Sequence, residues 1–219
     1  VYGASDSLPR LWWLVGLAFV FFVSPGLNLG TEAVAYAQRE HWILLLCLPY
    51  LILVSIRLRG GSVGLAGGWG AGVAMGLAVS MKPHYAAVWL GVEALGFVLQ
   101  RDVRGILRAE TIAVPCVGIV YLLLVGLTAP DYFRTTVPLA LNTYWAYQVP
   151  WTDLIGIVPI GLLGLGILAV RAVPAEDPGR SLATVFLVAS LGAYAASFLG
   201  GTTWSYPLLP FPGLIGVPS

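Results

Sequence analysis

The sequence predicts an all-α integral membrane protein, a polytopic bundle of about seven transmembrane helices forming one domain over residues 1–219. Of the 219 residues, 58% are hydrophobic and 10% are charged, whereas soluble domains carry roughly 25% charged residues. The apolar runs are long and continuous, without the alternation of a membrane β-barrel strand, and helices satisfy their own backbone groups in lipid. This composition argues against a soluble globular protein and against a disordered chain. A formal net charge of +1 also excludes a nucleic-acid-binding protein.

Seven apolar runs, each bounded by charged or polar residues, are expected to form the spans. A transmembrane helix needs about 20 apolar residues, so the chain has room for six to eight spans joined by short loops. The expected spans are residues 11–25, 42–56, 62–81, 85–99, 111–128, 154–170 and 181–199. Residues 207–218 either begin a further span or lie at the interface.

The basic residues give the bundle an orientation. If seven spans alternate, most of the 11 cations fall on one side, which we take as cytoplasmic because Lys and Arg accumulate there. That side holds Arg10, Arg57, Arg59, Arg101, Arg104, Arg108, Arg171 and Arg180, and the other holds Arg39, Lys82 and Arg134. The short loops 57–61, 100–110 and 171–180 are expected to hold basic anchors and little else.

Two features lie inside the spans. The third span carries a stripe of small residues at four-residue spacing, namely Gly64, Gly68, Gly72 and Gly76. Such a stripe lets another helix approach closely, so we expect it to be a helix-packing face. Glu93 lies in the middle of the fourth span, where an ionisable group costs about 2.5–3.5 kcal/mol to insert. It is therefore expected to face the bundle, either in a buried structural hydrogen bond or as a proton relay.

The loop at residues 26–41, on the cation-poor side, carries two carboxylates, Glu32 and Glu40, next to Arg39 and His41. Residues 32–41 contain no Pro or Gly, so we expect a short helix with Glu32, Tyr36, Arg39 and Glu40 on one face. One interpretation is a solvated helix at the interface. The other is that one carboxylate is a catalytic base or a metal ligand and that Arg39 binds phosphate.

Lys82 is the only lysine in the chain, and it stands on the cation-poor side just before Pro83 and His84. A compact ammonium suits a phosphate as a point charge, although a lysine at this position can also simply snorkel to the interface. His84 is a candidate proton-transfer group or hydrogen-bond donor, or a histidine satisfied at the interface.

Aromatic side chains gather in the loop at residues 130–153, which includes Arg134 and has no charge from Thr135 to Thr152. Tyr144 and Trp145 suit either a segment lying in the membrane interface or a platform on which a sugar ring stacks. Trp204 lies in the last loop on the same side, residues 200–210.

Four local patterns make the chain resemble the GT-C glycosyltransferases of bacterial membranes, near the mannosyltransferase-like and aminoarabinose-transferase-like branch. They are QREH at 38–41, GLAVSMKPH at 76–84, PDYF at 130–133 and WSYP at 204–207. The resemblance implies an enzyme of the bacterial inner membrane that transfers a sugar from a polyprenyl-phosphate donor on the extracytoplasmic face. It also implies a carboxylate as general base and cations, or a divalent metal ion, holding the phosphate.

Carried onto this chain, the resemblance assigns catalytic roles to Glu40, Glu32 and His84. Lipid-phosphate binding falls to Lys82, Arg39 and Arg134, and contacts with the sugar or acceptor to Tyr144, Trp145 and Trp204. The family's principal carboxylate follows its first span, whereas the loop at 26–41 looks like a later one. We therefore expect the chain, which begins at Val1, to be part of a longer membrane protein. The alternatives are a transporter or flippase subunit that works through Glu93, and a non-catalytic subunit that packs through the glycine stripe.

Overall fold

A computed structural model describes residues 39–101, 107–144, 150, 155 and 157–200. Most of these residues are helical and none belongs to a strand, which confirms the all-α prediction for the part of the chain described. The α-helices are α2 (Arg39–Leu58), α3 (Leu65–Met81), α4 (Ala86–Gln100), α5 (Ala109–Thr128), α6 (Val137–Tyr144), α8 (Ile157–Ala172) and α9 (Pro178–Gly200). A 3-10 turn, η4 (Pro83–Tyr85), precedes α4, and a π-helix, η6 (Tyr132–Thr136), precedes α6.

Six of these helices occupy positions where the sequence predicts a span, whereas the predicted span at 11–25 lies outside the described residues. Among the described residues, two segments are long and apolar enough to cross a membrane, Ala109–Thr128 and Gly179–Ala196. Three shorter apolar helical segments accompany them, Trp42–Leu58, Leu65–Met81 and Leu163–Ala172. These segments support a membrane association for the chain.

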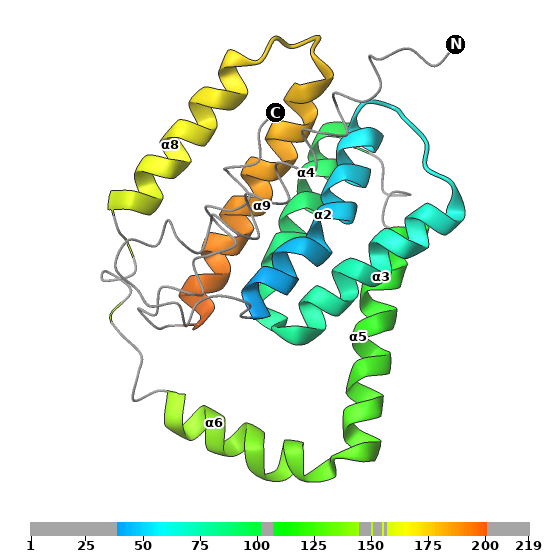
Figure 1. The fold of residues 1–219 in the computed structure, drawn as a ribbon, viewed down its shortest axis with the longest axis vertical. Coiled ribbons are helices and arrows are strands. Elements are labelled where there is room, and N and C mark those ends of the chain that lie inside the picture. Colours follow the sequence, from blue (N-terminus) through cyan, green and yellow to red (C-terminus); the bar gives the residue numbers. More distant parts are fainter. Residues whose placement is uncertain (1–38, 102–106, 145–149, 151–154, 156, 201–219) are drawn as a thin grey trace.

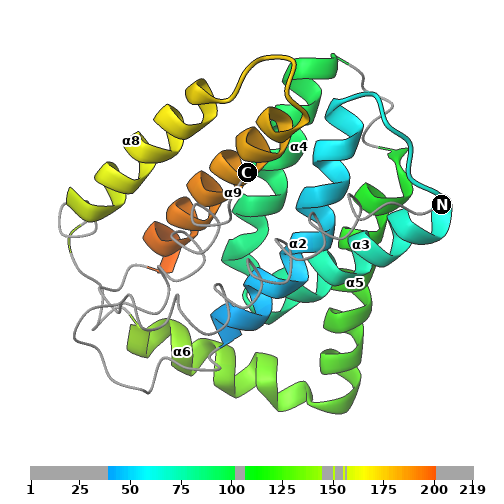
Figure 2. The ribbon, with the colours of Figure 1, turned by 45° about the horizontal axis from the view of Figure 1, so that its top comes forward.

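The helices pack as a row in which each contacts the next. Figures 1 and 2 show α8 against α9, α9 against α4 and α2, α2 against α3, and α3 against α5. The core lies around α2, where Ile43, Tyr50 and Leu51 are fully buried. On the far side of the core, Val185 and Ala189 of α9 are equally buried. The outer helices, in contrast, leave large apolar side chains exposed, among them Leu122 and Leu123 of α5 and Leu165 and Leu168 of α8.

The glycine stripe of α3 packs against α5 of the same chain. A Cβ atom at Gly76 would come within 2.7 Å of Val117 Cβ, and one at Gly72 would overlap the backbone of Glu110. At Gly68 the nearest neighbour is the Glu110 carboxylate, while Gly64 has open space around it. Three of the four glycines thus contact α5 of this chain. The absence of a side chain at these positions lets α3 and α5 come so close.

The loop at 130–153 begins as a helical segment. After Thr128 the chain forms η6 and then α6, which runs across the end of the bundle and away from α5 (Figure 1). Apolar residues of α5 from Ile119 to Leu124 are exposed where this helix extends beyond α3.

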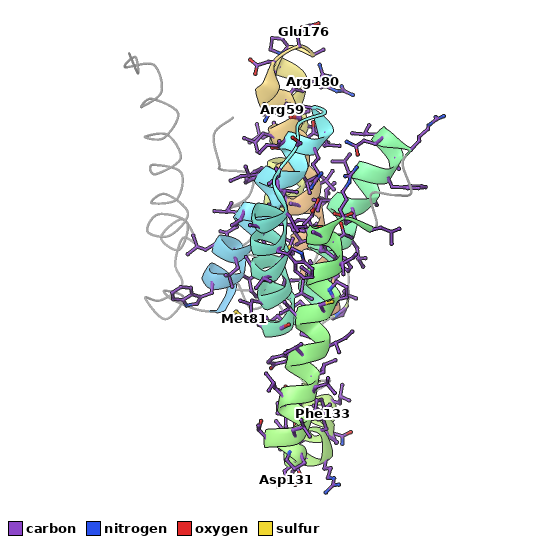
Figure 3. The ribbon with its side chains drawn as sticks, turned by 90° about the vertical axis from the view of Figure 1, so that its right-hand side faces the viewer. Arg59, Met81, Asp131, Phe133, Glu176 and Arg180 are labelled. Carbon is purple, nitrogen blue, oxygen red and sulfur yellow. The ribbon has the colours of Figure 1, made fainter. Side chains whose placement is uncertain are left out.

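The two ends of the molecule differ in charge. Figure 3 shows Arg59 and Arg180 at one end and Asp131 and Phe133 at the opposite end, with Met81 between them. Arg57, Arg101, Arg108 and Arg171 belong to the first end, because each stands where a helix ends or begins there. We call this first end the arginine-rich end. The rest of the molecule on the other side, from the corner at Met81 outward to Asp131, we call the cation-poor end.

Candidate functional site

An ion pair is buried at the arginine-rich end. Arg57, in the last turn of α2, pairs through Nε and Nη2 with the carboxylate of Glu110, in the first turn of α5. Glu110 is 1% exposed, and the Arg57 side chain is 21% exposed. Each charge also interacts favourably with its helix dipole, because a negative charge stabilises the first turn of a helix and a positive charge the last turn. The pair fixes the end of α2 to the start of α5.

Gln100 and Arg108 extend this pair to α4. Gln100 Nε2 donates a hydrogen bond of 2.8 Å to the carbonyl oxygen of Arg57, and Arg108 donates to Gln100 Oε1 at 3.0 Å. Gln100 is the last residue of α4, whose C-cap Arg101 has a left-handed backbone with φ of 50°. The ends of α2 and α4 and the start of α5 are therefore joined by one hydrogen-bonded chain.

Deeper in the bundle, Glu93 of α4 accepts hydrogen bonds from two other helices. The Tyr50 hydroxyl of α2 donates to Glu93 Oε1 at 2.5 Å, and Thr111 of α5 donates to Oε2 at 3.4 Å. Trp89 Nε1 in turn donates to the Tyr50 hydroxyl at 3.1 Å. The sequence predicts that Glu93 has hydrogen-bond partners inside the bundle but does not indicate which residues they are. The structure identifies them as Tyr50 and Thr111.

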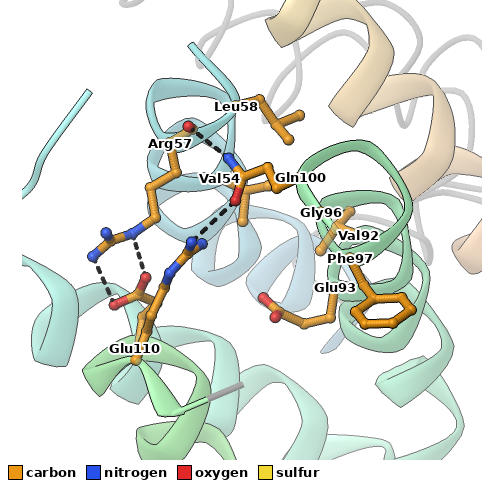
Figure 4. A pocket seen from close by; sticks show the side chains of 10 residues that line it. Val54, Arg57, Leu58, Val92, Glu93, Gly96, Phe97, Gln100 and Glu110 are labelled. Atoms are coloured by element: carbon orange, nitrogen blue, oxygen red, sulfur yellow. Dashed lines mark hydrogen bonds and ion pairs between the residues drawn. The ribbon is translucent and has the colours of Figure 1, made fainter. Parts of the chain in front are cut away.

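A small cavity of about 30 Å³ joins the two groups. Figure 4 shows Glu93 on one side of it and the pair of Arg57 and Glu110 on the other, with Gln100 between. Its remaining lining comes from Val54, Leu58, Val92, Gly96, Phe97 and Arg108. The cavity has room for water, which needs about 10–15 Å³, and is far too small for a sugar.

The predicted phosphate site at the other end centres on the corner between α3 and α4. Lys82 links the two helices in an extended conformation, with φ of −149° and ψ of 100°, and Pro83 begins η4. Tyr85 is 1% exposed and belongs to the apolar core, which anchors the corner. Lys82 and His84 are half-buried, and the His84 ring lies 4.9 Å from the Tyr85 ring.

For the other predicted site residues, the structure gives the helix and the end of the bundle to which they belong. Arg39 and Glu40 form the first turn of α2, at the same end of the bundle as the corner because α2 and α3 are antiparallel neighbours. Arg134 lies exposed in η6, beyond the corner, since Asp131 and Phe133 lie well past Met81 in Figure 3. Tyr144 is the last residue of α6. Glu32, Trp145 and Trp204 lie outside the described residues.

The structure therefore brings Lys82 and His84 together and puts Arg39 and Glu40 at their end of the bundle, while it separates Arg134 from the corner. Among the described residues, no group of three or more His, Cys, Asp or Glu side chains could hold a metal ion.

The expectation that loop 100–110 holds only basic anchors is wrong. Helix α5 begins at Ala109, and Glu110 is buried against Arg57 rather than solvated. A signal was present, because an acid directly before a long apolar run is typical of a first helical turn. Its partner, 53 positions earlier in the chain, could not be read from the sequence.

Comparison with protein-family models, with curated proteins and with solved structures finds no match to this chain.

Proposed function

We propose that this chain is part of a polytopic membrane enzyme, a glycosyltransferase of the GT-C type, that moves a sugar from a polyprenyl-phosphate donor to an acceptor at the cation-poor end. In this proposal seven spans cross the bacterial inner membrane, with the arginine-rich end in the cytoplasm. The observation that carries it is the position of Lys82, the only lysine in the chain, on a helix corner at the end opposite to the arginines.

The corner suits a phosphate. The extended Lys82 and the proline at the start of η4 fix the backbone, while the buried Tyr85 holds the corner to the core. A lysine ammonium carried by such a corner acts as a point charge toward a phosphate. It would stabilise the negative charge that develops on the phosphate as the sugar leaves.

The remaining roles follow the resemblance. Glu40 and Glu32 are the candidate carboxylates, Arg39 and Arg134 the further phosphate contacts, and His84 the proton donor. Tyr144, Trp145 and Trp204 are the candidate platforms for the sugar or the acceptor. Of these, Arg39 and Glu40 support the proposal by their place at the end of the bundle that carries Lys82.

Transfer of sugar from radiolabelled polyprenyl-phosphate hexoses and pentoses, in membranes that contain the full-length protein, tests the proposal. We expect Lys82→Ala to lower the rate at least about tenfold, which corresponds to about 1.4 kcal/mol of transition-state stabilisation, and Lys82→Arg to retain part of it. Arg171→Ala, which removes an exposed cation at the arginine-rich end, is the matched control and leaves the rate unchanged. Full transfer by a normally assembled Lys82→Ala variant would refute the site.

A second candidate function is proton-coupled transport, favoured by the buried hydrogen bonds of Glu93. Ionisable residues within membrane helices commonly belong to ion or substrate pathways. For a transporter we expect a substrate-dependent proton flux that Glu93→Gln abolishes, and no sugar transfer that depends on Lys82.

A further inference from the structure

The two oxygens of the Glu93 carboxylate have different surroundings. Oε1 accepts the hydrogen of the Tyr50 hydroxyl at 2.5 Å, and the oxygen of that hydroxyl accepts from Trp89 Nε1 at 3.1 Å. An indole N–H can only donate, so the Tyr50 oxygen accepts from Trp89 and its single hydrogen is available for Glu93 Oε1. In this arrangement Oε1 is an acceptor.

The hydrogen-bond partner of Oε2 can act either as a donor or as an acceptor. Thr111 Oγ1 lies 3.4 Å away, and a threonine hydroxyl can rotate either to donate or to accept. Oε2 can therefore accept from Thr111 when the carboxylate is ionised, or donate to Thr111 when Oε2 itself carries a hydrogen. A proton bound by Glu93 belongs on this oxygen.

A cavity with room for water borders Glu93. The cavity measures about 30 Å³ and is lined by polar groups of Gln100, Arg108 and Glu110 as well as by Glu93. A cavity of this size holds a water molecule when it offers two to four polar partners. It lies at the arginine-rich end, where the partly exposed Arg57 and the exposed Phe97 border it.

The charges that face the cavity come from three parts of the chain. They are Arg57 of α2, Glu93 of α4, and Arg108 and Glu110 at the start of α5, and no described residue of α9 or η4 lines it. Arg57 and Glu110 offset each other in their ion pair. Ionised Glu93 then balances Arg108, so uptake of a proton by Glu93 changes the cavity from neutral to singly positive.

We propose that Glu93 is a reversible proton-binding site that exchanges protons with the aqueous phase at the arginine-rich end through water in this cavity. A hydronium ion there gives its proton to Glu93 Oε2. One O–H bond of the hydronium breaks, one O–H bond forms on Oε2, and a neutral water remains. The site does not depend on the proposed function, because a transferase and a transporter can equally contain it.

Infrared spectroscopy of the purified full-length protein, without substrate, tests this proposal. The difference spectrum between wild type and Glu93→Gln isolates the carbonyl stretch of a protonated Glu93. We expect this band to appear and disappear reversibly with pH in wild type, to be absent in Glu93→Gln, and to persist in Glu176→Gln, which removes an exposed acid. A band that is absent at every pH, or one that survives in Glu93→Gln, overturns the proposal.

Two further variants test the oxygen and the route, and both retain Glu93. Tyr50→Phe removes the hydrogen bond to Oε1, so the carbonyl band should move to higher frequency; an unmoved band contradicts the assignment of the proton to Oε2. Gly96 lines the cavity, and a Cβ there would meet no atom within 4 Å. Gly96→Leu should therefore fill the cavity and slow the deuterium shift of the band at least tenfold after transfer to D2O.

Gly70→Leu is the control for that variant, because Gly70 has equally open space on another helix and does not line the cavity. Equal exchange rates in Gly96→Leu and Gly70→Leu would exclude this route.

Discussion

Arg57 and Glu110 form a buried ion pair between the last turn of α2 and the first turn of α5, 53 positions apart in the chain. A charged group in this position is costly to bury, and its partner and additional hydrogen bonds must offset that cost. The carbonyl of Arg57 also accepts from Gln100, so the same residue holds α4 in place. The pair therefore orders three helices at the arginine-rich end.

Breaking this pair from one side should destabilise the bundle. Glu110→Gln leaves Arg57 without its counter-charge, and we expect a loss of about 3 kcal/mol, at the low end for a buried pair because Arg57 is 21% exposed. Unfolding by SDS titration in detergent micelles measures it. Glu176→Gln, at an exposed loop position, should change the stability by less than about 0.5 kcal/mol.

Removing both charges distinguishes the free-energy cost of leaving one charge buried without a partner from the stability that the ion pair itself contributes. The double variant Arg57→Met with Glu110→Leu should recover most of the loss, since apolar residues of similar volume often replace a buried pair without penalty. A double variant as unstable as Glu110→Gln alone would show that the pair itself supplies the stability.

The glycine stripe predicts a sharp contrast between two neighbouring positions of α3. At Gly72 a Cβ would overlap the Glu110 carbonyl and come within 2.7 Å of Ala113 Cβ, whereas at Gly70 it would meet nothing within 4 Å. Gly72→Ala should therefore cost about 1–3 kcal/mol through overpacking. Gly70→Ala should be neutral, or stabilising by up to about 1 kcal/mol from helix propensity. Equal effects of the two substitutions on SDS unfolding would contradict the α3–α5 contact.

The contact between α4 and α9 offers a second matched pair. A Cβ at Gly192 would lie 2.6 Å from Val88 Cα and 2.7 Å from the Ala87 carbonyl oxygen, while one at Gly91 would make an ordinary contact of 3.5 Å with Val188. We expect Gly192→Ala to lower the stability by about 1–3 kcal/mol and Gly91→Ala to be tolerated. If Gly91→Ala is the more damaging substitution, the register of α4 on α9 is wrong.

The hydrogen bonds of Tyr50 predict the cost of removing one hydroxyl. Tyr50→Phe leaves the Trp89 N–H and Glu93 Oε1 without their partner inside the bundle, so we expect a loss of about 1–3 kcal/mol. Tyr121→Phe, at an exposed position of α5, is the control and should have little effect. In a double-mutant cycle with Glu93→Gln the two changes should be non-additive; additive losses would mean that the hydroxyl and the carboxylate do not interact.

The helices were largely predictable from the sequence, because long apolar runs bounded by charges leave little choice in their position. The predicted span 111–128 and the helix Ala109–Thr128 differ by one half-turn, and 85–99 and Ala86–Gln100 by one residue. The segment 130–153 is the exception. Its aromatic and polar residues indicate a loop, whereas the structure has the π-helix η6 and the helix α6 there.

The partners of the polar residues were not predictable. Which helix faces Glu93 depends on the packing order of the bundle, and nothing local to Glu93 indicates Tyr50 or Thr111. A charge between two apolar runs is usually solvated, so the sequence does not indicate that Glu110 is buried. Its burial depends on Arg57 and on the space left by Gly68, and both arise from tertiary packing.

The most direct measurement is the side of the membrane on which each end lies, because sugar transfer at Lys82 and proton exchange at Glu93 are assigned to opposite aqueous phases. Single cysteines at Ser62 and at Thr135, both exposed, report on the arginine-rich and the cation-poor end in a background that lacks Cys47 and Cys116. In intact spheroplasts, an impermeant maleimide should label Thr135→Cys at once and Ser62→Cys only after permeabilisation. Labelling of both cysteines from the same side would contradict a bundle that spans the membrane between its two ends.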